Sequence, residues 1–254
     1  MPTLDSRPQE VFKPVAIKPP SENRLLFVVR CIADLQLFTV YRFLKEPLRR
    51  CRGRLLDVGA GEAPWREFVS QAEYVGADIE SSTDFGMRRR PDVAYYSGDT
   101  LPYPDNSFDN VLCTEVLEHV REPKSFLLDL HRVLRSNGTL ILTVPWSARL
   151  HHLPHDYARY TPAGLSTLLE SAGFSVEMIE QRGNEVASIA NKLLVLTIRL
   201  FRARPWYAAI LTWPLGLIAA PLAMAFIGAA HISIALGLRM PEDPLGYGVI
   251  ARRR

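Results

Sequence analysis

The chain has 254 residues, a formal net charge of +3 and a hydrophobic content of 48%. This length is sufficient for one α/β domain with its own core, and the average composition excludes a disordered, collagen-like or coiled-coil protein. The charge is too small to indicate a nucleic-acid partner, and we expect none. The three cysteines, Cys31, Cys51 and Cys113, are not spaced as metal ligands, so we expect reduced thiols in a cytoplasmic protein.

The first part of the chain contains several prolines and no apolar run. Residues 1–23 are therefore expected to be a flexible lead-in rather than a signal peptide. Apolar residues at spacings of three and four then predict one helix over residues 24–48, with Asn23 as its N-cap and Pro47 at its end.

Strand and helix signals alternate from residue 50 onward. Helices are predicted over residues 62–71, 123–134 and 161–172, and Ser136-Asn137-Gly138 is expected to end the second of them. Strands are predicted over residues 54–58, 74–78, 93–96, 108–114, 139–144, 174–180 and 245–251. Because helices between strands require crossovers, these seven strands are predicted to form the mostly parallel sheet of a Rossmann-like α/β fold. Residues 50–184 would form its core, and the last strand would join the sheet from outside this range. Ligands of such sheets bind at the carboxyl ends of the strands.

A glycine loop follows the first predicted strand, in Asp57-Val58-Gly59-Ala60-Gly61. Glycines allow close approach of the backbone to a ligand. Asp78 ends the next strand, where a carboxylate can accept the hydroxyls of a ribose. Either feature alone is also common in structural turns. A dinucleotide enzyme would have a further glycine where this chain has Pro64, which disfavours NAD as the cofactor.

Three more blocks follow: Gly98-Asp99-Thr100-Leu101-Pro102, the EVLEHV segment from Glu115, and His131-Arg132-Val133-Leu134. Together with the loop and Asp78, these blocks resemble the class I methyltransferases that use S-adenosylmethionine, in the type 11-like subgroup with LDVGxG, GDxLP and EVLEHV motifs. The resemblance covers about residues 50–182, and it departs from the family at Ala63, where a third glycine is frequent. It implies that the cofactor is held by Asp57, Gly59, Gly61, Asp78, Ile79, Asp99, Thr100, Leu101 and Glu115.

The EVLEHV segment also suggests a metal site. In a helical turn, Glu115, Glu118 and His119 would share one face. The E-x-x-E-H pattern resembles the metal-binding segment of small-RNA 2′-O-methyltransferases and ubiquinone-pathway O-methyltransferases, which implies Mg²⁺ or Mn²⁺ acting on a substrate hydroxyl. The candidate ligands are Glu115, Glu118, His119 and His155. The alternative is structural, with Glu118 and His119 tying the loop to neighbouring backbone.

A polar and aromatic segment follows the fifth predicted strand and resembles a block of methyltransferases that accompany glycan and lipid assembly. We expect His155 to act as a general base, with Glu115 and His119 as further catalytic candidates. In the alternative, Arg159 and Tyr160 only anchor the next helix. The predicted acceptor-binding residues are Trp146, His151, His155, Tyr157 and Arg159.

Residues 205–238 contain no Lys, Arg, Asp or Glu. Residues 185–240 are therefore predicted to be an apolar helical insertion before a last strand and basic tail, 241–254. The stretch is long for one membrane span and short for two, and the last strand must return to the sheet. We expect a helix pair, bent at Pro214 and Pro221, in the interface of the cytoplasmic leaflet, with nearby arginines attracting anionic lipid. The alternatives are a helical cap, a dimer contact and a single transmembrane pass.

The sequence thus predicts an S-adenosylmethionine-dependent methyltransferase. Its expected acceptor is a hydroxyl of a small molecule, saccharide or lipid near a membrane. Two alternatives stay open: a protein that binds S-adenosylmethionine without turnover, and a membrane-associated scaffold with a vestigial methyltransferase fold.

Overall fold

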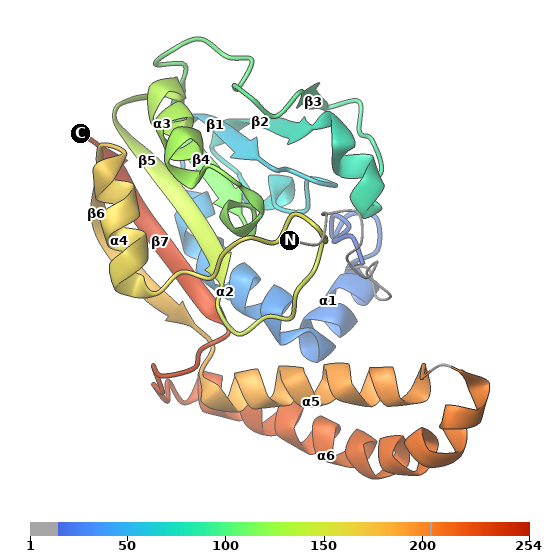
Figure 1. The fold of residues 1–254 in the computed structure, drawn as a ribbon. Helices are drawn as coiled ribbons and strands as arrows, with labels where there is room; N and C mark the ends of the chain where they lie inside the picture. Colours follow the sequence, from blue (N-terminus) through green and yellow to red (C-terminus); the bar gives the residue numbers. More distant parts are fainter. Residues whose placement is uncertain (1–14, 204) are drawn as a thin grey trace, which may run out of the picture.

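The computed structural model describes residues 15–203 and 205–254. Their centre is a seven-stranded sheet in the order β3-β2-β1-β4-β5-β7-β6 (Figure 1). Strand β7 is antiparallel to β5 and β6, and the other neighbouring pairs are parallel. This confirms the predicted fold class. The strands are β1 (Gly53–Val58), β2 (Ala72–Ile79), β3 (Val93–Tyr96), β4 (Phe108–Thr114), β5 (Leu134–Pro145), β6 (Phe174–Arg182) and β7 (Gly246–Arg253).

Alternate residues of the central strands face two separate cores, as the period of a strand requires. Leu56 and Val111 belong to the core under α3 (Pro123–Val133) and α4 (Pro162–Ser171). Leu55 and Leu112, one position away, belong to the core under α2 (Leu35–Arg50). Both faces of the sheet are therefore covered by helices, which is the arrangement that buries a parallel sheet.

The amino-terminal helix is divided in two, so the prediction of one helix over residues 24–48 was wrong. Helix α1 (Arg24–Ala33) begins at Asn23, whose side chain accepts from the Leu26 N–H at 2.8 Å as predicted. Asp34 adopts an extended conformation and caps α2 by accepting from the Leu37 N–H at 3.1 Å. An aspartate is a strong N-cap, which explains the break. Helix α2 continues through Pro47 to Arg50.

Two further local predictions were wrong. Residues 62–71 form turns and the 3₁₀ helix η2 (Arg66–Phe68), because Ala63 has a left-handed φ of 53° and the Trp65 side chain is buried against the α2 core. Ser136-Asn137-Gly138 lies inside β5 rather than ending a helix. The segment forms a bulge there, since the pairing with β4 shifts register between Phe108 and Asn110.

The apolar insertion is a helical hairpin between β6 and β7 (Figure 1). It consists of α5 (Glu185–Phe201), the 3₁₀ helix η5 (Trp206–Ala208) and α6 (Ala209–Ala235). Helix α6 continues through Pro214 and Pro221, and its partner is α5, so the helix pair does not turn at these prolines. The base of the hairpin packs on α2 through Leu35, and the remainder extends away from the sheet.

Candidate functional site

The predicted cofactor residues meet at one edge of the sheet. Strands β1, β2, β3 and β4 are parallel, so their carboxyl ends lie along the same edge, here called the carboxyl edge. The chain leaves β1 for β2 and β3 on one side and for β4 and β5 on the other. Such a reversal of strand order marks the usual ligand-binding position of open α/β sheets. Asp57, Asp78 and Glu115 all lie at or next to strand ends on this edge.

Asp57 is a fully buried carboxyl near the end of β1. Its Oδ2 accepts from the Tyr74 hydroxyl at 2.5 Å, while no described residue donates to its Oδ1. Burial raises the pKa of Asp57 to about 7, although the hydrogen bond from Tyr74 lowers it. A buried polar atom without a partner costs stability, so this oxygen is a place where a ligand donor would be favourable. No motif in the sequence indicated Tyr74 as the partner of Asp57.

The glycine loop turns tightly after β1. Gly59 and Gly61 have φ values of 75° and 54°, which L-residues with a Cβ adopt only at a cost. A Cβ on Gly59 would come within 2.3 Å of Cγ2 of Val116 in the EVLEHV segment. The loop and that segment are therefore in direct contact. Ala63, at the position of the family's third glycine, also has a left-handed φ, of 53°.

Asp78 joins the loops that follow β1 and β2. Its Oδ2 accepts from the Gly61 N–H and its Oδ1 from the Ile79 N–H, both at 2.8 Å. Burial raises the pKa of this carboxyl, and the two backbone donors oppose the rise. A carboxylate oxygen can accept a second hydrogen bond, so Asp78 keeps acceptor capacity for hydroxyl groups.

The predicted segment after β3 is anchored at Leu101. The Leu101 N–H donates to Asp129 at 2.6 Å and its carbonyl accepts from Arg132 at 3.1 Å, both on α3. Asp99 and Thr100 are exposed beside it, and the Asp99 carboxylate accepts from the Ser97 hydroxyl. The role of the HRVL block therefore includes holding the segment that the resemblance places beside the adenine.

Glu115 does not share a helical face with Glu118 and His119, so that prediction was wrong. It has a φ of 53° and lies before η4 (Leu117–His119), which is a single 3₁₀ turn. Its carboxylate instead accepts from Arg182 at 2.8 Å. The Arg182 side chain is 1% exposed and also donates to the Val144 carbonyl at 3.0 Å. A buried guanidinium requires such partners, and no motif in the sequence indicated Arg182.

Glu118 and His119 belong to a different cluster. Glu118 is fully buried, and neither of its carboxylate oxygens has a hydrogen-bond partner among the described residues. One ring nitrogen from each of His119, His151 and His152 lies within 4.8 Å of the other two. Burial raises the pKa of Glu118, and burial lowers the pKa of His119 to about 4 and of His152 to about 3, which keeps these imidazoles neutral.

The segment between β5 and α4 crosses the carboxyl edge. Phe85, from the 3₁₀ helix η3 (Glu80–Phe85) after Asp78, lies edge-on to His152 and His155 with ring centroids 4.9 and 6.0 Å apart. His155 is exposed, and its Nδ1 lies 2.9 Å from the Tyr157 hydroxyl. The structure thus places the predicted acceptor segment against the element that follows the predicted ribose-binding residue.

Arg159 and Trp146 are held by other parts of the fold. Arg159 donates to both carboxylate oxygens of Asp156, at 2.5 and 2.9 Å, and to the Arg149 carbonyl. The bidentate pair already uses the guanidinium, which disfavours acceptor binding by Arg159, and these partners lie in its own segment rather than on α4. Trp146 is partly buried with its ring centroid 6.3 Å from that of Tyr247.

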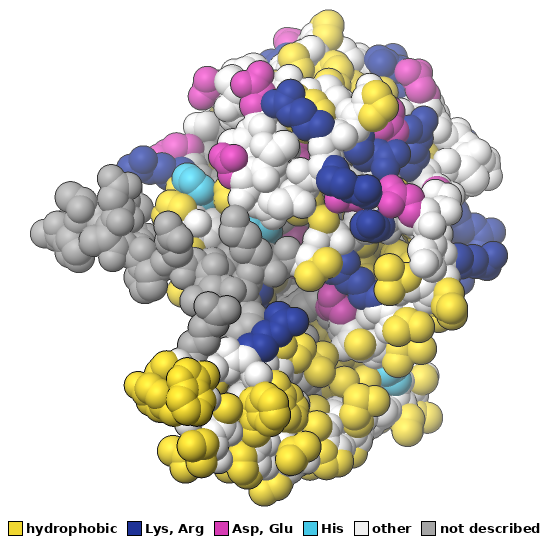
Figure 2. All heavy atoms as spheres, turned by 90° about the vertical axis from the view of Figure 1, so that its right-hand side faces the viewer, with side chains coloured by type: hydrophobic (Ala, Val, Ile, Leu, Met, Phe, Trp, Pro, Cys, Tyr) yellow, Lys and Arg dark blue, Asp and Glu magenta, His cyan; other side chains and the backbone are white. Residues whose placement is uncertain are grey.

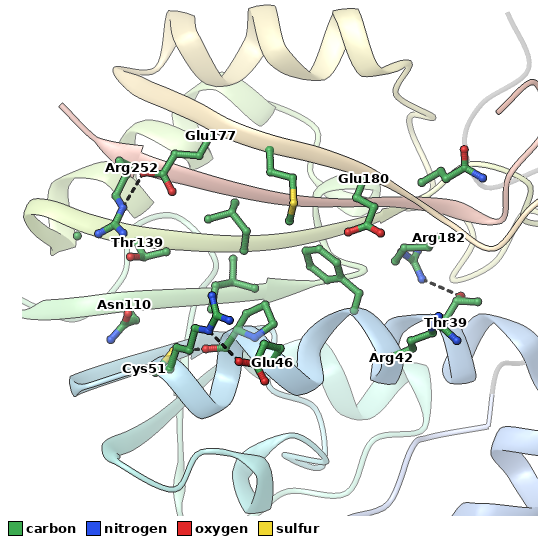
Figure 3. Close-up of a pocket in the computed structure, with 18 of the residues that line it drawn as sticks. Thr39, Arg42, Glu46, Cys51, Asn110, Thr139, Glu177, Glu180, Arg182 and Arg252 are labelled. Atoms are coloured by element: carbon green, nitrogen blue, oxygen red, sulfur yellow. Dashed lines mark hydrogen bonds and ion pairs between the residues drawn. The ribbon is translucent and has the colours of Figure 1, made fainter. Parts of the chain in front are cut away.

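A groove of about 960 Å³ lies elsewhere, between α2 and strands β5 to β7 (Figure 3). Its described lining includes none of the predicted cofactor, acceptor or catalytic residues. Arg42 and Glu46 reach it from α2, and Glu180 and Arg252 from the sheet, in the arrangement that Figure 3 shows. Arg182 lines this groove at one end and reaches Glu115 with the same side chain.

Comparison with known proteins finds a family match that includes the predicted cofactor residues of the carboxyl edge. Residues 56–142 match the family model described as a methyltransferase domain. This part of the chain is therefore similar to a methyltransferase domain. The matched range includes the glycine loop, Asp78, the GDxLP segment and the EVLEHV segment.

Several known methyltransferases are similar to about half of this chain. A probable S-adenosylmethionine-dependent methyltransferase of Mycolicibacterium smegmatis is 30% identical over 50% of this chain and 54% of its own length. A demethylmenaquinone methyltransferase of Renibacterium salmoninarum is 34% identical over 55% of this chain and 60% of its own length. The chain thus spans little more than half of these relatives. A methyltransferase structure from Mesorhizobium loti has a TM-score of 0.48 at 14% identity, covering 85% of this chain and 98% of its own.

Proposed function

We propose that this chain transfers a methyl group from S-adenosylmethionine to a hydroxyl of a membrane-borne small molecule, saccharide or lipid. The observation that carries the proposal is the contact of Phe85 with His152 and His155. It joins the segment after the predicted ribose-binding Asp78 to the predicted acceptor segment. A donor and an acceptor held at this one edge would be close together, and proximity with alignment is the main contribution an enzyme makes to such a displacement.

The residues of the carboxyl edge fit this cofactor. The unpartnered Oδ1 of Asp57 is a buried acceptor suited to an ammonium or hydroxyl donor. Asp78 retains acceptor capacity, and Gly61 leaves the backbone beside it uncovered by a side chain. Asp57, Gly59, Gly61 and Asp78 would hold the amino-acid and ribose parts, with Asp99 near the base. When bound, S-adenosylmethionine supplies a methyl group that its sulfonium already activates for nucleophilic attack.

Among the three catalytic candidates, His155 is the best general base. The Glu115 carboxylate is committed to Arg182, and burial together with His151 lowers the pKa of His119 to about 4, which makes it a weak base. His155 is exposed, and the Tyr157 hydroxyl orients its ring through Nδ1. When Nδ1 donates to the Tyr157 oxygen, Nε2 has the free lone pair that can take the proton of an acceptor hydroxyl.

The hairpin supports a membrane-borne acceptor. Residues Trp206–Ala235 form one helix long and apolar enough to cross a membrane, with a mean hydropathy of 2.0. Only 17% of its most apolar window is buried within the described chain. A helix that is apolar all round belongs in a protein core or in lipid, and this one has no core around it. In Figure 2 most of the coloured side chains visible at the hairpin end of the molecule are hydrophobic.

The charges of the hairpin favour a position along the membrane surface over end-on insertion. Lys192 and Arg199 are seven residues apart on α5, hence on one face, and Arg202 lies near the tip. Charges at the tip would be costly at the bilayer centre, whereas a helix pair in the interface keeps them at the headgroups. Trp206 at the tip is 81% exposed, and an indole is favourable at the same depth.

The hairpin also starts at the correct edge of the sheet. Strand β6 is antiparallel to β7 and therefore parallel to β5, so β6 ends and β7 begins at the carboxyl edge. The hairpin leaves the domain between these two points. Helix α1 adds exposed Leu25 and Val29, and its Ile32 carbonyl lies 2.9 Å from Nε2 of His231 on α6. An interfacial hairpin would thus bring the proposed catalytic edge toward lipid.

The cofactor part is tested by calorimetry of the full chain with S-adenosylmethionine, followed by assays of S-adenosylhomocysteine release with total-lipid or water-soluble extracts as acceptors. We expect binding that is lost in Asp78→Asn, and turnover with the lipid extract. Binding without turnover in any extract would favour a protein that only binds the cofactor. Failure to bind would favour a scaffold with a vestigial fold and refute the proposed activity.

The membrane part is tested by flotation with vesicles containing anionic lipid. We expect wild-type protein to float, and Ile210→Glu/Leu217→Glu, which places charges at positions 71% and 68% exposed, to stay with the soluble fraction. Leu128→Glu is the matched control, because Leu128 is 47% exposed on α3 away from the hairpin. Wild-type protein that forms a stable dimer and does not float would show that a second copy covers the hairpin.

A further inference from the structure

A compact group of metal-ligating side chains lies beside the proposed acceptor segment. It comprises His119 from η4, His151 and His152 from the segment after β5, and the buried carboxyl of Glu118. The ring centroids of the three histidines lie 4.7 to 5.2 Å apart. We propose that these four residues bind one divalent transition-metal ion. This inference does not depend on the proposed methyl transfer.

Two of the imidazoles are oriented as metal ligands are. His119 Nδ1 lies 2.7 Å from the His155 carbonyl, and His151 Nδ1 lies 3.0 Å from the Arg149 carbonyl. A carbonyl only accepts, so each Nδ1 carries the proton and each Nε2 has a lone pair. Metal-bound histidines are typically fixed in this way, with the other ring nitrogen donating to a carbonyl or carboxylate.

Both Nε2 atoms lie near the same carboxylate oxygen. Glu118 Oε1 lies 3.6 Å from His119 Nε2 and 3.9 Å from His151 Nε2. These distances are too long for hydrogen bonds, and neither oxygen of this fully buried carboxyl has a partner among the described residues. Two imidazole lone pairs and a carboxyl without a hydrogen-bond partner among the described residues thus lie around one point, and a cation that displaces the carboxyl proton would satisfy all three groups.

The donor set selects the class of metal. Three imidazole nitrogens and one carboxylate oxygen suit Zn²⁺ and Co²⁺, whereas Mg²⁺ prefers oxygen ligands and water. The Mg²⁺ of the sequence prediction is therefore disfavoured, as are two of its predicted ligands. Glu115 is bound to Arg182, and the His155 ring faces Tyr157. Zinc–nitrogen bonds of ~2.0–2.1 Å require nitrogens about 3.4 Å apart, so the three rings would close slightly on binding.

The position of the site suggests its effect. His119 follows β4, whereas His151 and His152 belong to the segment that carries His155. One ion would attach this segment to the carboxyl edge. It would also fix the His119 ring and, with it, the hydrogen bond from His119 Nδ1 to the His155 carbonyl. A metal would therefore order the acceptor segment as well as stabilise the fold.

The test uses untagged full-length protein, because a polyhistidine tag binds the same metals. Chelator-treated protein is titrated with Zn²⁺ and with Co²⁺, and metal content is measured after gel filtration. We expect one ion per chain, the visible absorption of four-coordinate Co²⁺, and a rise in the melting temperature. His151→Gln and Glu118→Gln should each weaken binding at least tenfold, while His131→Gln, which alters a histidine of α3 away from the cluster, should bind as wild type does.

X-ray absorption of zinc-loaded wild-type protein provides a check that needs no variant to fold. It should report nitrogen and oxygen ligands with several imidazoles. Less than half an equivalent of bound Zn²⁺, sulfur ligation, or wild-type affinity in folded His151→Gln would overturn the proposal. None of these readouts measures methyl transfer, so a failed activity assay and a failed metal site are distinguished.

Discussion

The buried carboxyl of Asp57 should make the stability of the protein depend on pH. In the unfolded chain its pKa is near 3.8, and burial raises it in the folded protein to about 7. The folded state therefore holds the proton more tightly than the unfolded state. Stability from this group is fully present below pH 3.8 and is lost as the pH rises through 7. With each pKa unit corresponding to about 1.4 kcal/mol, the cost at pH 8 is about 4 kcal/mol.

Asp57→Asn removes this charge at nearly constant size. At pH 5 about 1.7 kcal/mol of the cost is already present, so wild-type protein should lose about 2.5 kcal/mol between pH 5 and pH 8 through this residue. The variant should not lose that part, and its stability relative to wild type should rise by the same amount. At pH 8 the variant should also bind S-adenosylmethionine more weakly, because an amide cannot replace a carboxylate as the partner of a cationic group.

The measurement is urea unfolding of both proteins without cofactor, in the same detergent, at several values between pH 5 and pH 8. The difference between the two proteins is compared, since other groups that titrate in this range cancel in it. Glu73→Gln, which alters an exposed carboxylate on β2, should leave the pH dependence unchanged. If Asp57→Asn and wild type lost stability in parallel, Asp57 would not be the protonated buried acid described above.

Two other substitutions test the geometry of the edge. Gly59→Ala should cost more than ~2 kcal/mol of unfolding free energy, because its Cβ meets a neighbour at 2.3 Å. Gly86 also has a left-handed φ but open space around it, so Gly86→Ala should cost only ~1–2 kcal/mol. Equal losses in urea unfolding would contradict the contact at Gly59. Glu115→Ala should cost about 3 kcal/mol of unfolding free energy, because it leaves buried Arg182 without its carboxylate. Glu46→Ala breaks an exposed ion pair with Arg50 and should cost less than ~1 kcal/mol. A similar small effect at both glutamates would show that Arg182 is satisfied without Glu115.

The local residue pattern predicted the bounds of an element correctly where the element is short, apolar and bounded by turns. Strands β3 and β4 begin and end at the residues predicted, 93–96 and 108–114. It failed over residues 62–71, where a helical spacing competes with contacts made far along the chain. The Trp65 indole donates to the Thr114 hydroxyl at 3.2 Å, and Ala63 has left the helical region. Neither interaction has a signature within the segment itself.

In the candidate site, too, features with a local signal were predicted and features that depend on long-range contacts were not. The sequence placed Asp57, Asp78 and Glu115 at one edge correctly, because strand ends and glycine turns are local signals. It assigned Glu115 to a metal and did not consider Arg182, since a charged residue at the end of a strand is ordinarily exposed. The partnership spans 67 positions and depends on which strands become neighbours. The three-histidine cluster depends on the same long-range arrangement.

The end of β6 connects the proposed catalytic edge to the hairpin. Arg182 holds Glu115 at 2.8 Å, and two residues later Asn184 accepts from the Ala187 N–H to cap α5. The same Asn184 amide donates to Ser233 on α6 at 3.0 Å and to the Leu238 carbonyl at 3.1 Å. Both ends of the hairpin are thus tied to the strand end that positions Glu115. A hairpin fixed in a membrane surface would then fix the orientation of the edge as well, because rotation of one requires these buried hydrogen bonds to break.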